Sequence, residues 1–167
     1  EWLLDPYNIT IGSSGDTLSG DYTAAANSST ILASTIETAL TQNNVTISTG
    51  PRYSAGAEAG TITVSSVISS GSDKTLELKA ADQIVVNANI TRSGEGGLTL
   101  RAGSGLVSGT GTLNLSGGTT LSLAHGTTLA TNVDVGTGGA TIDFADLEVE
   151  YLVVGGGGGG GADNGGG

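Results

Sequence analysis

The sequence predicts an all-β fold, a parallel β-helix (β-solenoid) with about 22 residues and three short strands in each coil. The first observation is that apolar residues occur in short alternating bursts, such as Thr61–Val64 and Leu98–Leu100, separated by Gly, Ser, Asn or Asp. The second is that an ungapped offset of 22 residues superimposes Ile62–Ala80 on Ile84–Ala102. A β-sandwich also uses many short strands, but a fixed offset favours coils stacked about 4.8 Å apart.

The chain divides into four segments. Residues 1–28 form a strand or loop that enters the solenoid, and residues 29–60 hold a helix, the strand Val45–Ile47 and a loop excursion. Helical spacing of the apolar residues in Ser29–Leu40 predicts a short helix near residues 29–41, with a Ser or Thr as its N-terminal cap. Residues 61–154 form the coils of the β-helix, and residues 155–167 form a flexible glycine-rich tail.

One coil cannot enclose a core, so equivalent apolar side chains of successive coils are expected to stack in ladders. The offset of 22 continues from Ile84 to Leu106, and one inserted residue then gives steps of 23, such as Leu98 to Leu121. The last repeat is looser and places Ile142 over Leu121 after 21 residues. The predicted core ladder consists of Ile62, Val64, Leu76, Leu78, Ile84, Val86, Leu98, Leu100, Leu106, Leu113, Leu121 and Leu123.

The composition excludes several classes of site and partner. The chain has no Cys, which excludes a disulfide, a thiol nucleophile and a Cys-ligated zinc. A net charge of −11 with only five Lys and Arg residues argues against a nucleic-acid partner. No apolar run reaches the roughly 18 residues of a membrane-spanning helix. Because the chain opens on Glu1 without a signal sequence, we expect an internal piece of a longer protein.

No group of side chains in the sequence predicts catalysis, a cofactor or a metal, so we expect that the chain is not an enzyme. His125 is the only His and lies at a predicted, solvated turn. A β-helix lyase needs carboxylates and basic groups that converge on one face, whereas Asp134, Asp143 and Asp146 fall in adjacent predicted coils without a basic neighbour. The basic residues are predicted to scatter over the surface, with the last two out of register with the lysines: Arg52, Lys74, Lys79, Arg92 and Arg101.

Five asparagines lie in Asn-x-Ser/Thr sequons, which is a mild excess over chance in a chain so rich in Ser and Thr. These candidate N-glycosylation sites are Asn8, Asn27, Asn44, Asn89 and Asn114. Modification at these positions is a hypothesis that intact-mass analysis of native material can test.

A series of motifs occurs in a specific order over about residues 1–125. The chain opens with Glu1–Ile11 (EWLLDPYNITI) and continues with Ile36–Leu40 (IETAL) in the predicted helix, Asn43–Ile47 (NNVTI), Leu76–Ile84 (LELKAADQI) and Gln83–Ile90 (QIVVNANI). In this order the motifs resemble those of the filamentous-haemagglutinin and high-molecular-weight adhesin family, whose members are exported by two-partner secretion in Gram-negative bacteria.

The resemblance implies a right-handed β-helical stalk in a large adhesin that is secreted to the bacterial cell surface with the help of an outer-membrane transporter. It does not extend to the secretion module with its N-P-N motifs, which is absent from this sequence, or to Tyr151–Gly161. The latter stretch looks like the glycine-rich stretches of other bacterial surface proteins and phage fibre proteins. No family motif for a receptor site is present, so the resemblance assigns no binding residues.

We therefore expect a structural and adhesive module, a stiff stalk that projects surfaces toward a host or neighbouring-cell receptor or glycan. Two alternatives remain open. One is a self-assembling extracellular fibre subunit, because the bare ends of a solenoid expose unpaired strand edges through which copies can associate. The other is an extracellular polysaccharide-active β-helix enzyme, which would clear a glycan substrate.

Overall fold

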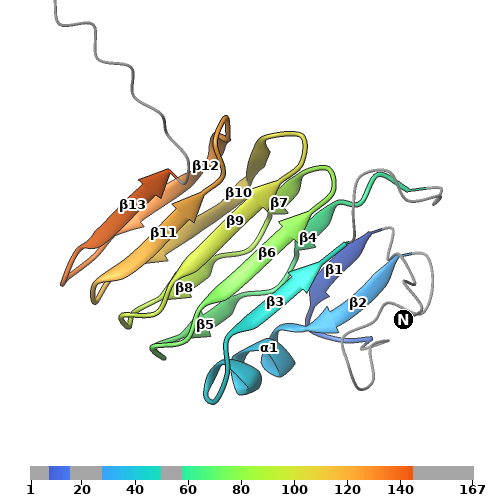
Figure 1. The fold of residues 1–167 in the computed structure, drawn as a ribbon. Helices are drawn as coiled ribbons and strands as arrows, with labels where there is room; N and C mark the ends of the chain where they lie inside the picture. Colours follow the sequence, from blue (N-terminus) through green and yellow to red (C-terminus); the bar gives the residue numbers. More distant parts are fainter. Residues whose placement is uncertain (1–7, 16–27, 50–57, 145–167) are drawn as a thin grey trace, which may run out of the picture.

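The computed structural model describes residues 8–15, 28–49 and 58–144 and shows a β-solenoid with one short helix (Figure 1). Every strand pairing among these residues is parallel, which excludes the β-sandwich. Successive coils pair Ile62 with Ile84, Leu98 with Leu121 and Leu121 with Ile142, which are the predicted steps of 22, 23 and 21 residues. The fold class and the spacing of the coils are therefore confirmed.

The strands form three faces along the solenoid (Figure 1). The first face contains, in spatial order, β2 (Ser29–Leu32), β1 (Ile9–Gly12), β4 (Ile62–Val64), β7 (Ile84–Val86) and the starts of β10 (Leu106–Leu115) and β12 (Thr128–Val135). The second face contains β5 (Ile68–Ser70), β8 (Ile90–Arg92) and the ends of β10 and β12. The third face contains β3 (Val45–Ser48), β6 (Leu76–Ala80), β9 (Leu98–Ala102), β11 (Thr119–Leu123) and β13 (Ala140–Phe144).

The third face shows most fully how alternation builds the core. Leu76 pairs in register with Leu98, and Leu98 pairs with Leu121 in the next coil. All three side chains are fully buried, whereas the residues between them in sequence, such as Glu77 and Thr99, are partly exposed. Because side chains alternate across a strand, each strand of the pattern places its Leu residues inside the solenoid and its polar residues outside.

The step between the second and third coils differs from the sequence-based expectation. Val107, and not Leu106, lies in register with Ile84, and Val107 is fully buried while Leu106 is half-buried. The inserted residue therefore lies in the turn between β9 and β10, one strand earlier than predicted. Two adjacent apolar residues fit the inward position equally well in the sequence pattern, so only the length of the turn decides between them. The other predicted ladder residues are at most 1% exposed.

The helix α1 spans Ala33–Leu40 and is shorter than predicted. Residues 29–32 instead form β2, because Ile31 lies in register with Ile11 of β1 and is buried with it. The predicted Ser or Thr cap is wrong as well, since Leu32 occupies the N-cap position and makes no side-chain capping bond. The buried residues of α1 are Ala33, Ile36 and Leu40, which face the core.

One strand lies out of sequence order. β1 is inserted between β2 and β4 and pairs in parallel with both. The outermost coil is therefore β2, α1 and β3, in which α1 takes the place of a strand on the second face and packs beside β5 (Figure 1). The carboxylate of Glu37 accepts a hydrogen bond from the backbone N–H of Ser69 in β5 at 2.7 Å. Of the predicted segments, the glycine-rich tail and most of the loop excursion lie outside the described residues.

The last described coil is less covered than the others. The inward positions of β12 and β13 continue the ladders, since Val135 pairs with Leu115 and Phe144 pairs with Leu123. Their exposed fractions nevertheless reach 48% and 44%, against 1% for each partner below. The solenoid thus presents an apolar end surface at this coil.

Candidate functional site

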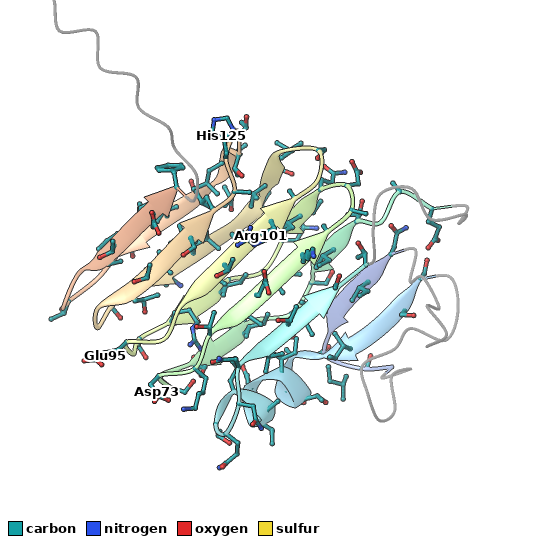
Figure 2. All side chains as sticks on the ribbon, in the orientation of Figure 1. Asp73, Glu95, Arg101 and His125 are labelled. Carbon is teal, nitrogen blue, oxygen red and sulfur yellow. The ribbon has the colours of Figure 1, made fainter. Side chains whose placement is uncertain are left out.

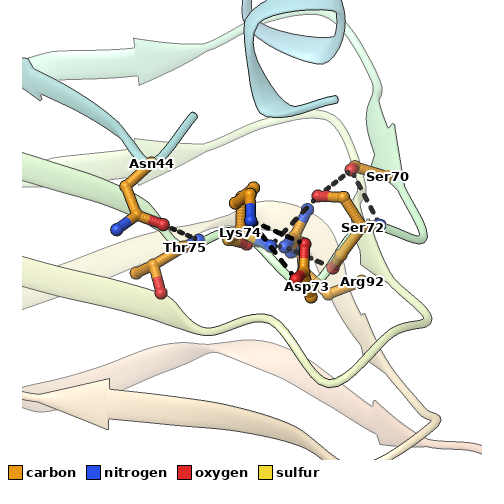
Figure 3. A network of polar contacts seen from close by, with 7 residues as sticks. All are labelled: Asn44, Ser70, Ser72, Asp73, Lys74, Thr75 and Arg92. Atoms are coloured by element: carbon orange, nitrogen blue, oxygen red, sulfur yellow. Dashed lines mark hydrogen bonds and ion pairs between the residues drawn. The ribbon is translucent and has the colours of Figure 1, made fainter. Parts of the chain in front are cut away.

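The most unusual polar residue of the structure is Arg92, at the end of β8 (Figure 3). Its side chain points into the solenoid and is fully buried, in register with Ser70 below and Leu115 above. The prediction that all basic residues scatter over the surface is therefore wrong at this position. Position 92 follows Ile90 by two residues, so the period-two pattern already placed it inside, but a charged side chain is an unlikely core residue on composition alone.

The guanidinium of Arg92 is held by backbone carbonyls of the coil below. Its Nη2 donates to the carbonyl of Lys74 and, at 3.3 Å, to the carbonyl of Ser72 (Figure 3). Its Nε and Nη1 are buried without a hydrogen-bond partner in the described structure. Burial of the charge lowers the pKa of Arg92 from its ordinary value. The residue therefore organises a corner of the solenoid, and it does so with an incompletely satisfied charge.

Gly96 makes this corner sterically possible. A Cβ atom at position 96 would overlap both the guanidinium Nη2 of Arg92 and the carbonyl of Lys74. The hydroxyl of Thr119 in the coil above is also buried and donates to the carbonyl of Gly94 at 2.7 Å. The corner thus spans three coils, and its polar groups serve the backbone of neighbouring turns.

The exposed charges lie mainly on the third face and in the turns (Figure 2). Lys79 and Arg101 are register partners on β6 and β9, so the expectation that they are out of register is wrong. The Nε of Arg101 lies 3.0 Å from a carboxylate oxygen of Glu77, whose other oxygen accepts from the hydroxyl of Thr46 at 3.1 Å. This exposed cluster links three strands of one face, and its single ion pair contributes little to stability.

The acidic residues do not converge. Asp134 and Asp143 lie on β12 and β13, which belong to two different faces of the same coil rather than to adjacent coils. Asp146 lies outside the described residues, where no group of three metal-ligating side chains could be sought. Within residues 8–15, 28–49 and 58–144 there is no such group. His125 lies exposed in the turn after β11, as predicted (Figure 2).

Three of the sequon asparagines share one structural role. The side-chain oxygens of Asn8, Asn44 and Asn89 accept the backbone N–H of Thr61, Thr75 and Thr112, respectively, at 2.8, 2.9 and 3.0 Å. Each acceptor lies just before a strand, and each donor occupies the same register one coil above. The side-chain oxygen therefore extends the inter-coil hydrogen bonding by one step beyond the strand.

This role accounts for the sequon pattern. An Asn at the corner, an inward apolar residue and an outward Thr form Asn-x-Thr by the geometry of the coil, as in Asn44–Thr46 and Asn89–Thr91. Asn114 differs, because it lies within β10 and its amide donates to the hydroxyl of Thr91 at 3.3 Å. Asn27 lies outside the described residues. Glycosylation of these residues stays a hypothesis.

A shallow groove of about 420 Å³ runs between α1 and the corner that follows β5. Its walls carry the hydroxyls of Ser34 and Thr38, the carboxylate of Glu37 and the segment 69–72. Glu37 is already engaged by the N–H of Ser69, and the hydroxyl of Thr38 donates to the carbonyl of Ser34. The groove is therefore the seam along which the helix joins the solenoid.

Comparison with family models, with curated proteins and with solved structures found no match to this chain. Among the residues that the structure describes, no helix is long and apolar enough to cross a membrane.

Proposed function

We propose that this chain is a structural and adhesive module of a large secreted bacterial surface protein. The observation that carries the proposal is the unbroken stacking of equivalent residues in successive coils, from Val45 through Leu76 and Leu98 to Ile142 on the third face. Each added coil extends such a solenoid by about 4.8 Å without a new kind of contact. Length is therefore set by the number of coils, which suits a stalk.

Polar groups of the described residues support a mechanical role. The corner asparagines and the buried Arg92 make their hydrogen bonds to the backbone of neighbouring coils. The sequence resemblance to the haemagglutinin-type adhesins adds the proposed setting, which is export through an outer-membrane transporter of a Gram-negative bacterium. In this proposal the outward side chains of the coils form the surface that meets a host or neighbouring-cell receptor or glycan.

Adhesion can be tested with the chain coupled to microspheres and incubated with cultured epithelial cells. We expect the native chain to retain microspheres on the cells and the variant Leu100→Asp to lose this retention, because Leu100 is fully buried in the stack. Equal retention by the two proteins, or none by either, would contradict adhesion through the folded solenoid.

The enzyme alternative has a separate test. The chain is incubated with a panel of bacterial and plant polysaccharides, and the release of reducing ends and of unsaturated sugars is measured. We expect no release above a boiled control. Release that disappears when Asp134 or Asp143 is changed to Asn would replace the adhesive proposal with a catalytic one.

A further inference from the structure

The two ends of the described solenoid differ in how their inward side chains are covered. At the end formed by β2, α1 and β3, the hydrophobic residues that face inward are at most 4% exposed, as Ile31, Ile36 and Val45 illustrate. At the end formed by β12 and β13, Val135 and Ile142 are 48% and 45% exposed. One end is thus closed and the other is open among the described residues.

Helix α1 explains why the first end is closed. Its apolar side packs Ile36 and Leu40 onto the core, and Glu37 occupies the backbone N–H of Ser69 on β5. An incoming strand would have to displace the helix to reach the second face. The closed end is therefore a poor acceptor for the open end of another copy, which argues against a head-to-tail fibre.

We propose that the open end, made of Leu129, Val133, Val135, Ile142 and Phe144, binds the open end of a second copy of this chain. Such an interface is isologous, because the same surface is used on both copies, and it closes after two subunits. A coil of about 22 residues also matches the 20–30 residues per side, about 800 Å² per partner, of a stable interface.

The third face gives the pairing its most specific form. β13 pairs with β11 on one edge, and its other edge has no partner strand among the described residues. A two-fold axis through Ile142 pairs β13 antiparallel with β13 of the second copy. Thr141 of one copy then faces Asp143 of the other, so the two carboxylates do not oppose each other directly.

Charge nevertheless makes the association depend on salt. Asp134 and Asp143 are exposed on the last coil of each copy, and the dimer brings the two sets of carboxylates closer together. We expect tighter association at 0.5 M than at 0.05 M NaCl, because salt screens this repulsion.

The primary test is the mass of the purified 167-residue chain in solution by light scattering after gel filtration. We expect twice the 16.2 kDa of one chain at about 100 µM. The double variant Ile142→Asp and Phe144→Asp is expected to be a monomer. The control is Val67→Asp, which changes a 53% exposed apolar residue on a corner outside the last coil and should remain a dimer.

A second measurement does not depend on these variants. Because the chain has no Cys, a single spin label can be placed by Asp143→Cys or by Thr46→Cys, two positions of one register column on β13 and β3. Four strand spacings separate them, so the label pair at position 46 should be farther apart than the pair at position 143 by about 38 Å. Head-to-tail assembly would instead give equal separations.

Several outcomes would overturn the proposal. A monomeric native chain, with β12 and β13 as protected from hydrogen exchange as β9 and β11, would mean that another part of the same chain covers the open end. Larger oligomers with equal label separations would mean a fibre. Dissociation of the Val67→Asp control would place the interface elsewhere. None of these outcomes bears on whether the microspheres adhere to cells.

Discussion

At the scale of single residues, Arg92 shows a polar group in the core that is only partly satisfied. Two of its three guanidinium nitrogens have no partner among the described atoms, and no carboxylate of the described chain forms an ion pair with it. An unpaired buried charge opposes folding, and replacing such a group by an apolar side chain of similar size is often neutral or stabilising.

We therefore expect Arg92→Met to leave the free energy of unfolding unchanged or to raise it by up to about 1–4 kcal/mol. Chemical denaturation measures this change, and Arg101→Met on the exposed third face is the matched control, expected within about 0.5 kcal/mol of the native chain. A loss of more than about 2 kcal/mol in Arg92→Met would mean that the two carbonyl contacts outweigh the buried charge.

The pKa of Arg92 adds a pH dependence to this expectation. Burial lowers the pKa of the folded state below that of the unfolded chain, so the unfolded chain holds the proton more tightly. The penalty is fully present at acid and neutral pH, and stability rises with pH only as the folded pKa is passed. The difference between the native chain and Arg92→Met should therefore be constant between pH 5 and pH 8, which parallel denaturation curves can check.

The corner asparagines give a second expectation at this scale. In Asn89→Ala the backbone N–H of Thr112 loses its acceptor at 3.0 Å, which should lower the free energy of unfolding by about 1–2 kcal/mol. Asn114→Ala is the control, because only the amide nitrogen of Asn114 is engaged, by the exposed-side hydroxyl of Thr91. Equal losses in the two variants would contradict the capping role.

At the scale of elements, the strands were predictable and the first coil was not. Alternation and the offset of 22 located β4, β6, β9 and β11, since each strand carries its own period-two signal. The helix was located with its start misplaced, because Ser29–Leu32 has apolar spacing that fits both a helix and a strand. Pairing with β1, a contact distant in sequence, decided the outcome. The insertion of β1 between β2 and β4 has no local signal at all.

The candidate site divides in the same way. The sequons were visible as motifs, but their capping role needed the register between coils, which joins residues such as Asn8 and Thr61 that lie far apart in sequence. The inward position of Arg92 followed from the alternation, and its charge led to the wrong interpretation. Local patterns therefore gave the strand positions, whereas polar contacts between coils could be assigned only from the structure.

An expectation for the helix concerns the closed end. Ile36 is fully buried against the core, so Ile36→Ala should lower the free energy of unfolding by about 2–4 kcal/mol. The amide of Ser69 should also exchange faster with solvent, because the helix carries the Glu37 carboxylate that binds it. Thr41→Ala, at an exposed position just after α1, is the control. Unchanged exchange at Ser69 would mean that the closed end does not depend on the packing of α1.

At the scale of the whole molecule, the core is a stack of layers in which each coil contacts mainly its neighbours. Stability in such an array is close to a sum of coil and interface contributions. Leu100, at the centre of the described stack, is covered by Leu78 on one side and Leu123 on the other. Leu100→Asp places a charge in both contacts and is expected to unfold several coils, seen as a large loss of β-sheet circular dichroism. Native thermal melting of this variant would contradict the observed register.

The same layered structure predicts that a coil can be added. Residues 62–83 form one complete coil, because Ile62 and Ile84 are register partners. A second copy of this segment inserted after Gln83 should stack between the original coil and β7, since Gln83 and Thr61 precede equivalent positions. The α1 contacts with the first β5 remain unchanged. With spin labels at Thr46→Cys and Asp143→Cys, the distance between the two ends should increase by about 4.8 Å in a chain kept monomeric by dilution. The melting temperature should not fall, because the insertion adds one coil and one interface of a kind that the molecule already contains. An unchanged distance would mean that the inserted segment loops out, and length would then not be set by the number of coils, which is the premise of a stalk.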